Sequence, residues 1–370
     1  MYKRQTPHYY KDFRCIAGAC TDTCCAGWDV DVDKDSYKYY KTVKGAFGKR
    51  LKSVMVPSQD GECTFTLQEG GRCPFLNDDN LCDLYIELGE DKLCETCAEF
   101  PRFINDYGNI REIGIAPSCK TAGELMFSYK DELTFDTVED NSLTLEPNDI
   151  DAYTYMHLRQ ARIVAFGIIS DRDISIFERL MLYLDYAKRI QKHLDAEKDE
   201  LIAGVAKRFC GADYREELLD KLKSRDEKLH GKRLIKGLRH FFDDFKGMEV
   251  INPDWNIHVA RVRQFLDGLA DDSGLAAVMK TYHAGSEAFA HEYEQLAMYY
   301  VYRYMLDAVN DYDILLKAKN AVIGILAVDI MAAANQASGC MPDFTMRVDI
   351  AHLYSCLLYT SPSPRDAHES

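Results

Sequence analysis

Residues 15–28 read C-I-A-G-A-C-T-D-T-C-C-A-G-W, which places Cys15, Cys20, Cys24 and Cys25 within eleven residues. Ten of the thirteen cysteines of the 370-residue chain lie between positions 15 and 119. Cysteines that serve as small buried hydrophobic residues are spread through a core. Metal ligands must instead converge on one point, so they come in short-range groups joined by small or flexible residues. The stretch therefore indicates thiolates that bind a soft metal.

Three kinds of site can use such a set of cysteines. Disulfides need an oxidising compartment, and residues 1–14 contain no apolar segment typical of a secretory signal, which disfavours disulfides. Four-cysteine zinc sites usually combine two C-x2-C pairs, and only Cys94 and Cys97 have that spacing. Iron–sulfur clusters are held by cysteines at more varied spacings. The spacing alone leaves zinc and iron–sulfur open.

The cysteine stretch ends in Gly27 and Trp28 and is followed by alternating Asp and Val residues up to Asp33. Further motifs follow in order: Cys73-Pro-Phe-Leu76, Leu81-Cys82, Glu87-Leu-Gly89, Cys97-x2-Phe100-Pro101-Arg102 and Ser118-Cys119. As an ordered set over about the first third of the chain, they resemble the flagellin lysine-N-methylases, which belong to a wider group of zinc- or iron-chelating cysteine-cluster proteins.

This resemblance implies a protein-lysine N-methyltransferase that transfers methyl from S-adenosylmethionine to lysine side chains of flagellin. It also implies a thiolate-bound iron–sulfur cluster, most simply of the 4Fe-4S type, and so favours iron–sulfur over zinc, which stays the alternative metal. The ligand candidates carried over by the resemblance are Cys15, Cys20, Cys24, Cys25, Cys73, Cys82, Cys97 and Cys119. Cys63 and Cys94 match the family pattern less clearly.

The usual nucleotide-binding signatures are missing from the sequence. It contains neither G-x-G-x-x-G nor G-x4-G-K-[ST], so we expect no Rossmann domain and predict that S-adenosylmethionine binds at the cluster. A second hypothesis from another class also fits the cysteines. It describes a non-catalytic zinc- or iron-binding or redox-sensing protein whose helices form an interaction domain.

Charge and hydropathy exclude two classes of partner. The net charge of −15 and pI near 5.2 disfavour binding to nucleic-acid phosphates. The longest apolar stretch, residues 321–334, is interrupted by Asp329 and is too short to span a bilayer, so no membrane insertion is expected. We therefore predict a cytoplasmic protein.

The predicted organisation is mainly α. We expect a cysteine-rich metal-binding lobe with little regular structure at 6–130, a linker or hairpin at 131–148, and an α-helical domain of seven to nine helices at 149–355. Within the lobe, residues 36–52 predict one helix that ends near Gly45 or Gly48. In the helical domain, Asp173 is the predicted N-cap of a helix through Phe177 and Ile190. Apolar periodicity predicts further helices at 194–209, 215–224, 231–246, 256–269, 287–309, 313–335 and 344–354.

Both ends of the chain resemble translated sequencing-adapter sequence. Residues 1–5 and 356–370 are therefore expected to be foreign, with the natural C-terminal segment missing.

Overall fold

The chain is described from a computed structural model that covers residues 2–16, 19–24, 26, 30–57, 62–79, 81–140, 150–229, 233–245, 252, 254–339 and 341–360. Cys25 and Trp28 of the cysteine stretch lie outside these residues. The alternating Asp and Val residues before Asp33, whose period of two is typical of a strand, are described only from Val30 onward, where β2 covers Asp31–Val32.

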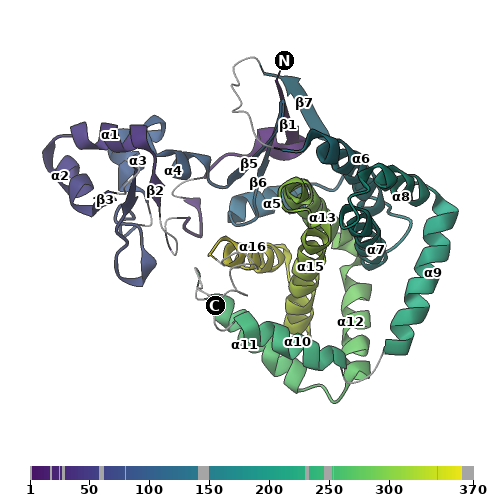
Figure 1. Ribbon diagram of the computed structural model, residues 1–370. Coiled ribbons are helices and arrows are strands. Elements are labelled where there is room, and N and C mark those ends of the chain that lie inside the picture. Colours follow the sequence, from purple (N-terminus) through teal and green to yellow (C-terminus); the bar gives the residue numbers. More distant parts are fainter. Residues whose placement is uncertain are drawn as a thin grey trace.

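The described chain is mainly helical, as predicted, and most helices follow residue 150 (Figure 1). They are α6 (Ala152–Ile169), α7 (Ile176–Leu194), α8 (Ile202–Phe209), α9 (Ala212–Leu229), α10 (Arg233–Asp244), α11 (Asp254–Asp267), α12 (Asp272–Ser286), α13 (Ala290–Tyr304), α14 (Ala308–Asp311), α15 (Ile314–Ala337) and α16 (Phe344–Thr360). Helix α5 (Lys120–Ser128) precedes them. Short 3-10 helices lie at His8–Asp12, Glu69–Gly71, Glu90–Lys92, Asp199–Leu201, Glu287–Phe289 and Met305–Asp307.

Two details of the helical prediction were wrong. The described residues after 150 form eleven α-helices instead of seven to nine, because α12 was missed and α14 is a separate single turn. The α12 segment is rich in small residues and lacks a clear apolar stripe. The N-cap of α7 is Ser175, not Asp173: Ser175 and Glu178 form a capping box, which satisfies two backbone N–H groups reciprocally.

A four-stranded sheet accompanies the helices, in the order β5-β6-β1-β7. Its strands are β1 (Lys3–Pro7), β5 (Arg102–Tyr107), β6 (Ile110–Ile115) and β7 (Phe135–Glu139). Strand β1 runs parallel to β6 and antiparallel to β7, and β5 and β6 form a hairpin. The predicted linker therefore contains β7, which pairs with the start of the chain. The described strands form no doubly wound parallel sheet, in line with the expected lack of a Rossmann domain.

A small lobe, which we define as residues 30–99, lies apart from the helical body in Figure 1. It contains β2, α1 (Lys34–Thr42), α2 (Gly45–Val54), β3 (Met55–Pro57), β4 (Cys63–Phe65), α3 (Asp83–Leu88) and α4 (Glu95–Glu99), with its strands in the order β2-β4-β3. The expectation of little regular structure was thus wrong. The lobe has its own hydrophobic core, which includes Val32, Tyr40, Leu51 and Phe75.

The helix predicted within 36–52 ends just before Gly45, close to its expected end, but a second helix, α2, follows it. Val43 is extended and ends α1, and Gly45, with φ of 81°, leads into α2. The turn is tight, because a Cβ added at Gly48 would lie 2.2 Å from the Val43 carbonyl oxygen. Glycine is the residue that permits this close backbone approach.

The main core joins the sheet to the helices. Tyr9, Phe103 and Ile115 from the N-terminal third pack in one hydrophobic cluster with residues of α6, α7, α13, α15 and α16. A buried ion pair crosses this core: Arg162 of α6 donates a 2.7 Å hydrogen bond to Glu112 of β6. The segments on both sides of the small lobe therefore belong to the helical body. The predicted domain boundaries stay a prediction.

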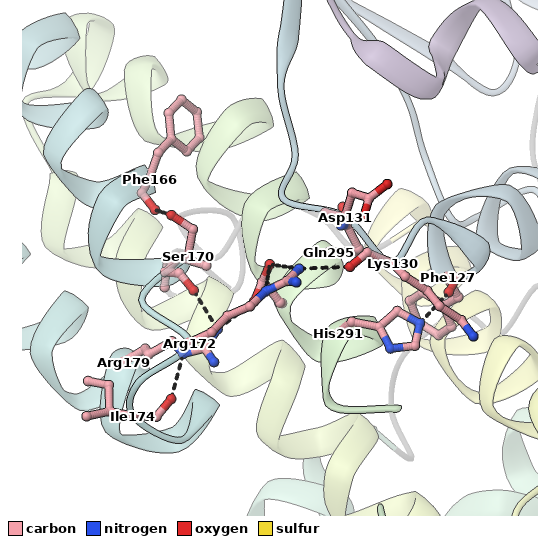
Figure 2. A network of polar contacts seen from close by, with 12 residues as sticks. Phe127, Lys130, Asp131, Phe166, Ser170, Arg172, Ile174, Arg179, His291 and Gln295 are labelled. Carbon is pink, nitrogen blue, oxygen red and sulfur yellow. Dashed lines mark hydrogen bonds and ion pairs between the residues drawn. The ribbon is translucent and has the colours of Figure 1, made fainter. Parts of the chain in front are cut away.

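A second polar network ties α13 to its neighbours. Arg172, which lies between α6 and α7, and Arg179, in the first turn of α7, both bind the buried carboxylate of Glu294. Figure 2 shows Gln295 directed at the Asp131 carbonyl and His291 at the Phe127 carbonyl, with distances of 3.0 Å in both cases. These bonds hold the segment after α5 against α13.

Candidate metal centre

Helix α4 carries the cysteine pair with the shortest spacing. Cys94 is its N-cap and is fully buried, and Cys97 lies in its first turn. Residues three apart lie on the same face of a helix, and here the two thiols share a hydrogen bond. That bond lowers the pKa of Cys94 and raises the pKa of Cys97, because one sulfur holds the proton for both.

Residues of α1 and its N-terminal flank position this pair. Asp33 caps α1 by accepting from the Ser36 N–H, and its second oxygen accepts from the Glu95 N–H at 3.0 Å. One carboxylate therefore caps two helices. Tyr40 donates to the Lys92 carbonyl at 2.8 Å and holds the chain that enters α4.

Cys73 and Cys82 enclose a loop with a polar centre. The Asn77 side chain accepts from the Asp79 and Leu81 N–H groups and donates to Asp83 at 3.0 Å. Asn side chains favour such turns because they replace backbone partners. Arg50 also bonds Asp83 and thereby ties the loop to α2. The backbones of Leu76 and Cys82 meet in an isolated bridge, so the loop brings Cys82 back toward Cys73.

The electrostatics show that these thiols are neighbours. Burial, together with negative charge on Cys82, Cys94 and Cys24, raises the pKa of Cys73 to about 11. Negative charge on Cys94, Cys73 and Cys82 likewise adds to the raised pKa of Cys97. Each thiolate therefore disfavours ionisation of the others. A bound cation would remove that cost, since coordinated thiols are deprotonated.

Cys119 forms a second group with the early cysteines. It is the N-cap of α5, and burial together with the charges of Cys20 and Cys24 raises its pKa to about 12. Cys24 influences both Cys73 and Cys119, so it links this group to the small lobe.

The loop that carries Cys20 and Cys24 is bound to the C-terminal helix. Asp22 forms an ion pair with His352 of α16, with 2.5 Å between Oδ2 and Nε2. Although burial acts in the opposite direction, this contact lowers the pKa of Asp22 and helps to raise the pKa of His352 to about 10. The pair is therefore ionised at neutral pH.

Six of the eight predicted ligands take part in these charge effects on thiol pKa values: Cys20, Cys24, Cys73, Cys82, Cys97 and Cys119. Cys15 is exposed, and Cys25 lies outside the described residues. Cys94, set aside as a weaker match, lies at the centre of the small-lobe group. Its C-x2-C spacing with Cys97 was the signal in the sequence. Cys63, the other weaker match, is buried in β4 near Cys94.

A set made up of thiols has the donor chemistry of zinc and iron–sulfur sites. Among the residues that the structure describes, no three ligating side chains converge closely enough to hold an ion. The ligand roles and the identity of the metal therefore stay predictions.

No helix within the described part of the chain is long and apolar enough to cross a membrane. No solved structure matches the chain.

The comparisons with known proteins agree on one family. The family model of the FliB lysine N-methylase C-terminal domain matches residues 162–359, more than half of the chain. The flagellar biosynthetic protein FliU of Salmonella muenchen is 31% identical over 119 residues, which are 30% of this chain and 70% of that protein. Lysine-N-methylases of Salmonella choleraesuis and Salmonella typhimurium are 30% identical over 119 residues, 30% of this chain and 29% of each of those proteins. The chain therefore belongs to the FliB lysine N-methylase family.

Proposed function

We propose that the protein is a lysine N-methyltransferase that transfers methyl from S-adenosylmethionine to lysine side chains of flagellin. The cofactor in this proposal is an iron–sulfur cluster bound by thiolates of the first third of the chain. Family membership supports lysine methylation, and the relatives named lysine-N-methylase and flagellar biosynthetic protein support a flagellar substrate.

The observation that carries the proposal is the gathering of thiols from distant parts of the sequence. Cys24, Cys73, Cys94 and Cys119 belong to four separate segments, yet the charges of Cys24 and Cys94 raise the pKa of Cys73, and the charge of Cys24 raises that of Cys119. A core that used cysteine only for packing would have no need of this arrangement. Thiolate ligation explains it.

When bound, an iron left open by three thiolates can hold the amino and carboxylate groups of the methionine moiety. Transfer itself requires a neutral lysine amine: the N–C bond forms, the S–CH3 bond breaks, and S-adenosylhomocysteine leaves. The ammonium proton must depart first, because only the free amine is a nucleophile. The net charge of −15 favours approach of a lysine-bearing surface.

The test uses protein purified and reconstituted anaerobically. Iron, sulfide and zinc are quantified, and methyl incorporation into flagellin is measured with labelled S-adenosylmethionine. We expect iron and sulfide in stoichiometric amounts and label on flagellin lysines. Stoichiometric zinc without methyl transfer would instead support the non-catalytic metal-binding alternative. A metal-replete protein that transfers no methyl would refute the enzymatic proposal alone.

A further inference from the structure

The cysteine loop of residues 20–24 lies against the far end of the chain. Its contact is the Asp22–His352 ion pair, which joins residues 330 positions apart. His352 is 4% exposed, and its other ring nitrogen, Nδ1, lies 3.1 Å from the Pro117 carbonyl oxygen. The imidazole therefore bridges the cysteine loop and the turn that precedes Cys119.

The helix that carries His352 is itself held firmly against α5. Lys120, the residue after Cys119, pairs with Asp349 of α16 at 2.6 Å. A Cβ added at Gly123 would lie 3.3 Å from Val348 Cγ1, so the two helices approach closely where glycine allows it. Because α16 is positioned on α5 at several points, the location of His352 relative to Cys119 is determined by packing.

From this geometry we propose that His352 is a positioning residue, which holds the Cys20–Cys24 loop beside Cys119 through Asp22. The C-terminal helix thereby completes a thiol group whose members come from the N-terminal third. In many proteins, metal ligands are oriented by such partners, which do not touch the metal themselves. The inference rests on the proposed function only for the metal that the thiols would hold, since the positioning itself needs no metal.

Cys356 also contacts His352, with Sγ 3.7 Å from each of its ring nitrogens. That residue lies in α16 with Sγ 3.6 Å from the Ser118 carbonyl oxygen, but it belongs to the segment expected to be foreign. The ion pair and the bond to the Pro117 carbonyl use His352 and Asp22 alone.

The first experiment tests whether Cys20 and Cys24 lie close to Cys119 in the metal-free protein. Metal-free protein is treated briefly with a mild oxidant, and disulfides between Cys119 and Cys20 or Cys24 are quantified by peptide mass spectrometry. Wild type should form these cross-links readily, and His352→Gln and Asp22→Asn should lose most of them. The matched control is His291→Gln, which removes a comparable bond from a ring nitrogen to a backbone carbonyl, on α13. Equal cross-link yields in wild type and both tether variants would overturn the proposal.

The second experiment reads metal affinity by competition with a chelator, at a temperature below the melting transition of every variant. Loss of an outer partner typically weakens metal binding by about 10–100-fold. We expect that loss of metal affinity in both His352→Gln and Asp22→Asn. The double variant should bind metal no more weakly than the single variant with the lower affinity, because all three changes break the same ion pair. Additive effects, or a loss no larger than in His291→Gln, would contradict the tether. A wild-type protein that binds no metal but forms the cross-links would refute the metal centre and leave the positioning role standing.

Discussion

Removal of the metal should unfold the small lobe and leave the helical body folded. The two have separate hydrophobic clusters, and three of the eleven buried residues in the small-lobe cluster are cysteines. A core of about 70 residues rarely contributes more than about 3–5 kcal/mol, whereas a structural thiolate-bound zinc contributes roughly 10–16 kcal/mol. Without metal, and with the thiols repelling one another as they ionise, the lobe should be marginally stable at best.

Hydrogen exchange followed by mass spectrometry measures this directly. Chelator treatment should lower the protection of peptides from β4 and α3 by at least about a thousandfold, which corresponds to about 4 kcal/mol. Peptides from α7 and α15 provide the internal control, since their buried residues belong to the main cluster. Unchanged protection in β4 and α3 after complete metal removal would refute the reasoning, because the lobe would then be stable through its own packing.

Two further substitutions test the core and the ligand set. Arg162→Met leaves Glu112 buried without its partner, so we expect a loss of about 3–5 kcal/mol and a melting temperature lower by about 10 °C. In calorimetry, the double variant Arg162→Met/Glu112→Leu should recover much of the lost stability. Equal melting temperatures of wild type and Arg162→Met would argue against a contribution of the Arg162–Glu112 ion pair to stability. Cys94→Ala should lower the metal content per chain as strongly as loss of any predicted ligand. Cys210 is exposed, and Cys210→Ala should leave the metal content unchanged. Wild-type metal content in Cys94→Ala would exclude Cys94 as a ligand.

Features that depend on near neighbours in the chain were largely predictable from the sequence. The α15 helix follows from a long apolar segment after the Asp313 cap, close to the predicted bounds of 313–335. The C-x2-C spacing of Cys94 and Cys97 places both sulfurs on one helical face wherever that helix lies. Its weaker family match nevertheless led us to set Cys94 aside.

Features that depend on distant contacts were not predictable. The sheet pairs β1 with β6 and β7, more than a hundred residues away, and no local pattern in residues 3–7 indicates these partners. Strands β3 and β4 of the small lobe were missed for the same reason, since three residues carry too little periodicity to identify.

By itself, the sequence determined the helical character of the chain, the concentration of thiols before residue 120 and the family resemblance that the comparisons confirmed. Only the tertiary structure decided which thiols are neighbours and that His352 contacts the Asp22 loop. The physical reason is that spacing along a chain governs turns and helix faces. Contacts between residues 22 and 352 exist only because α16 packs on α5 and carries its side chains to that position.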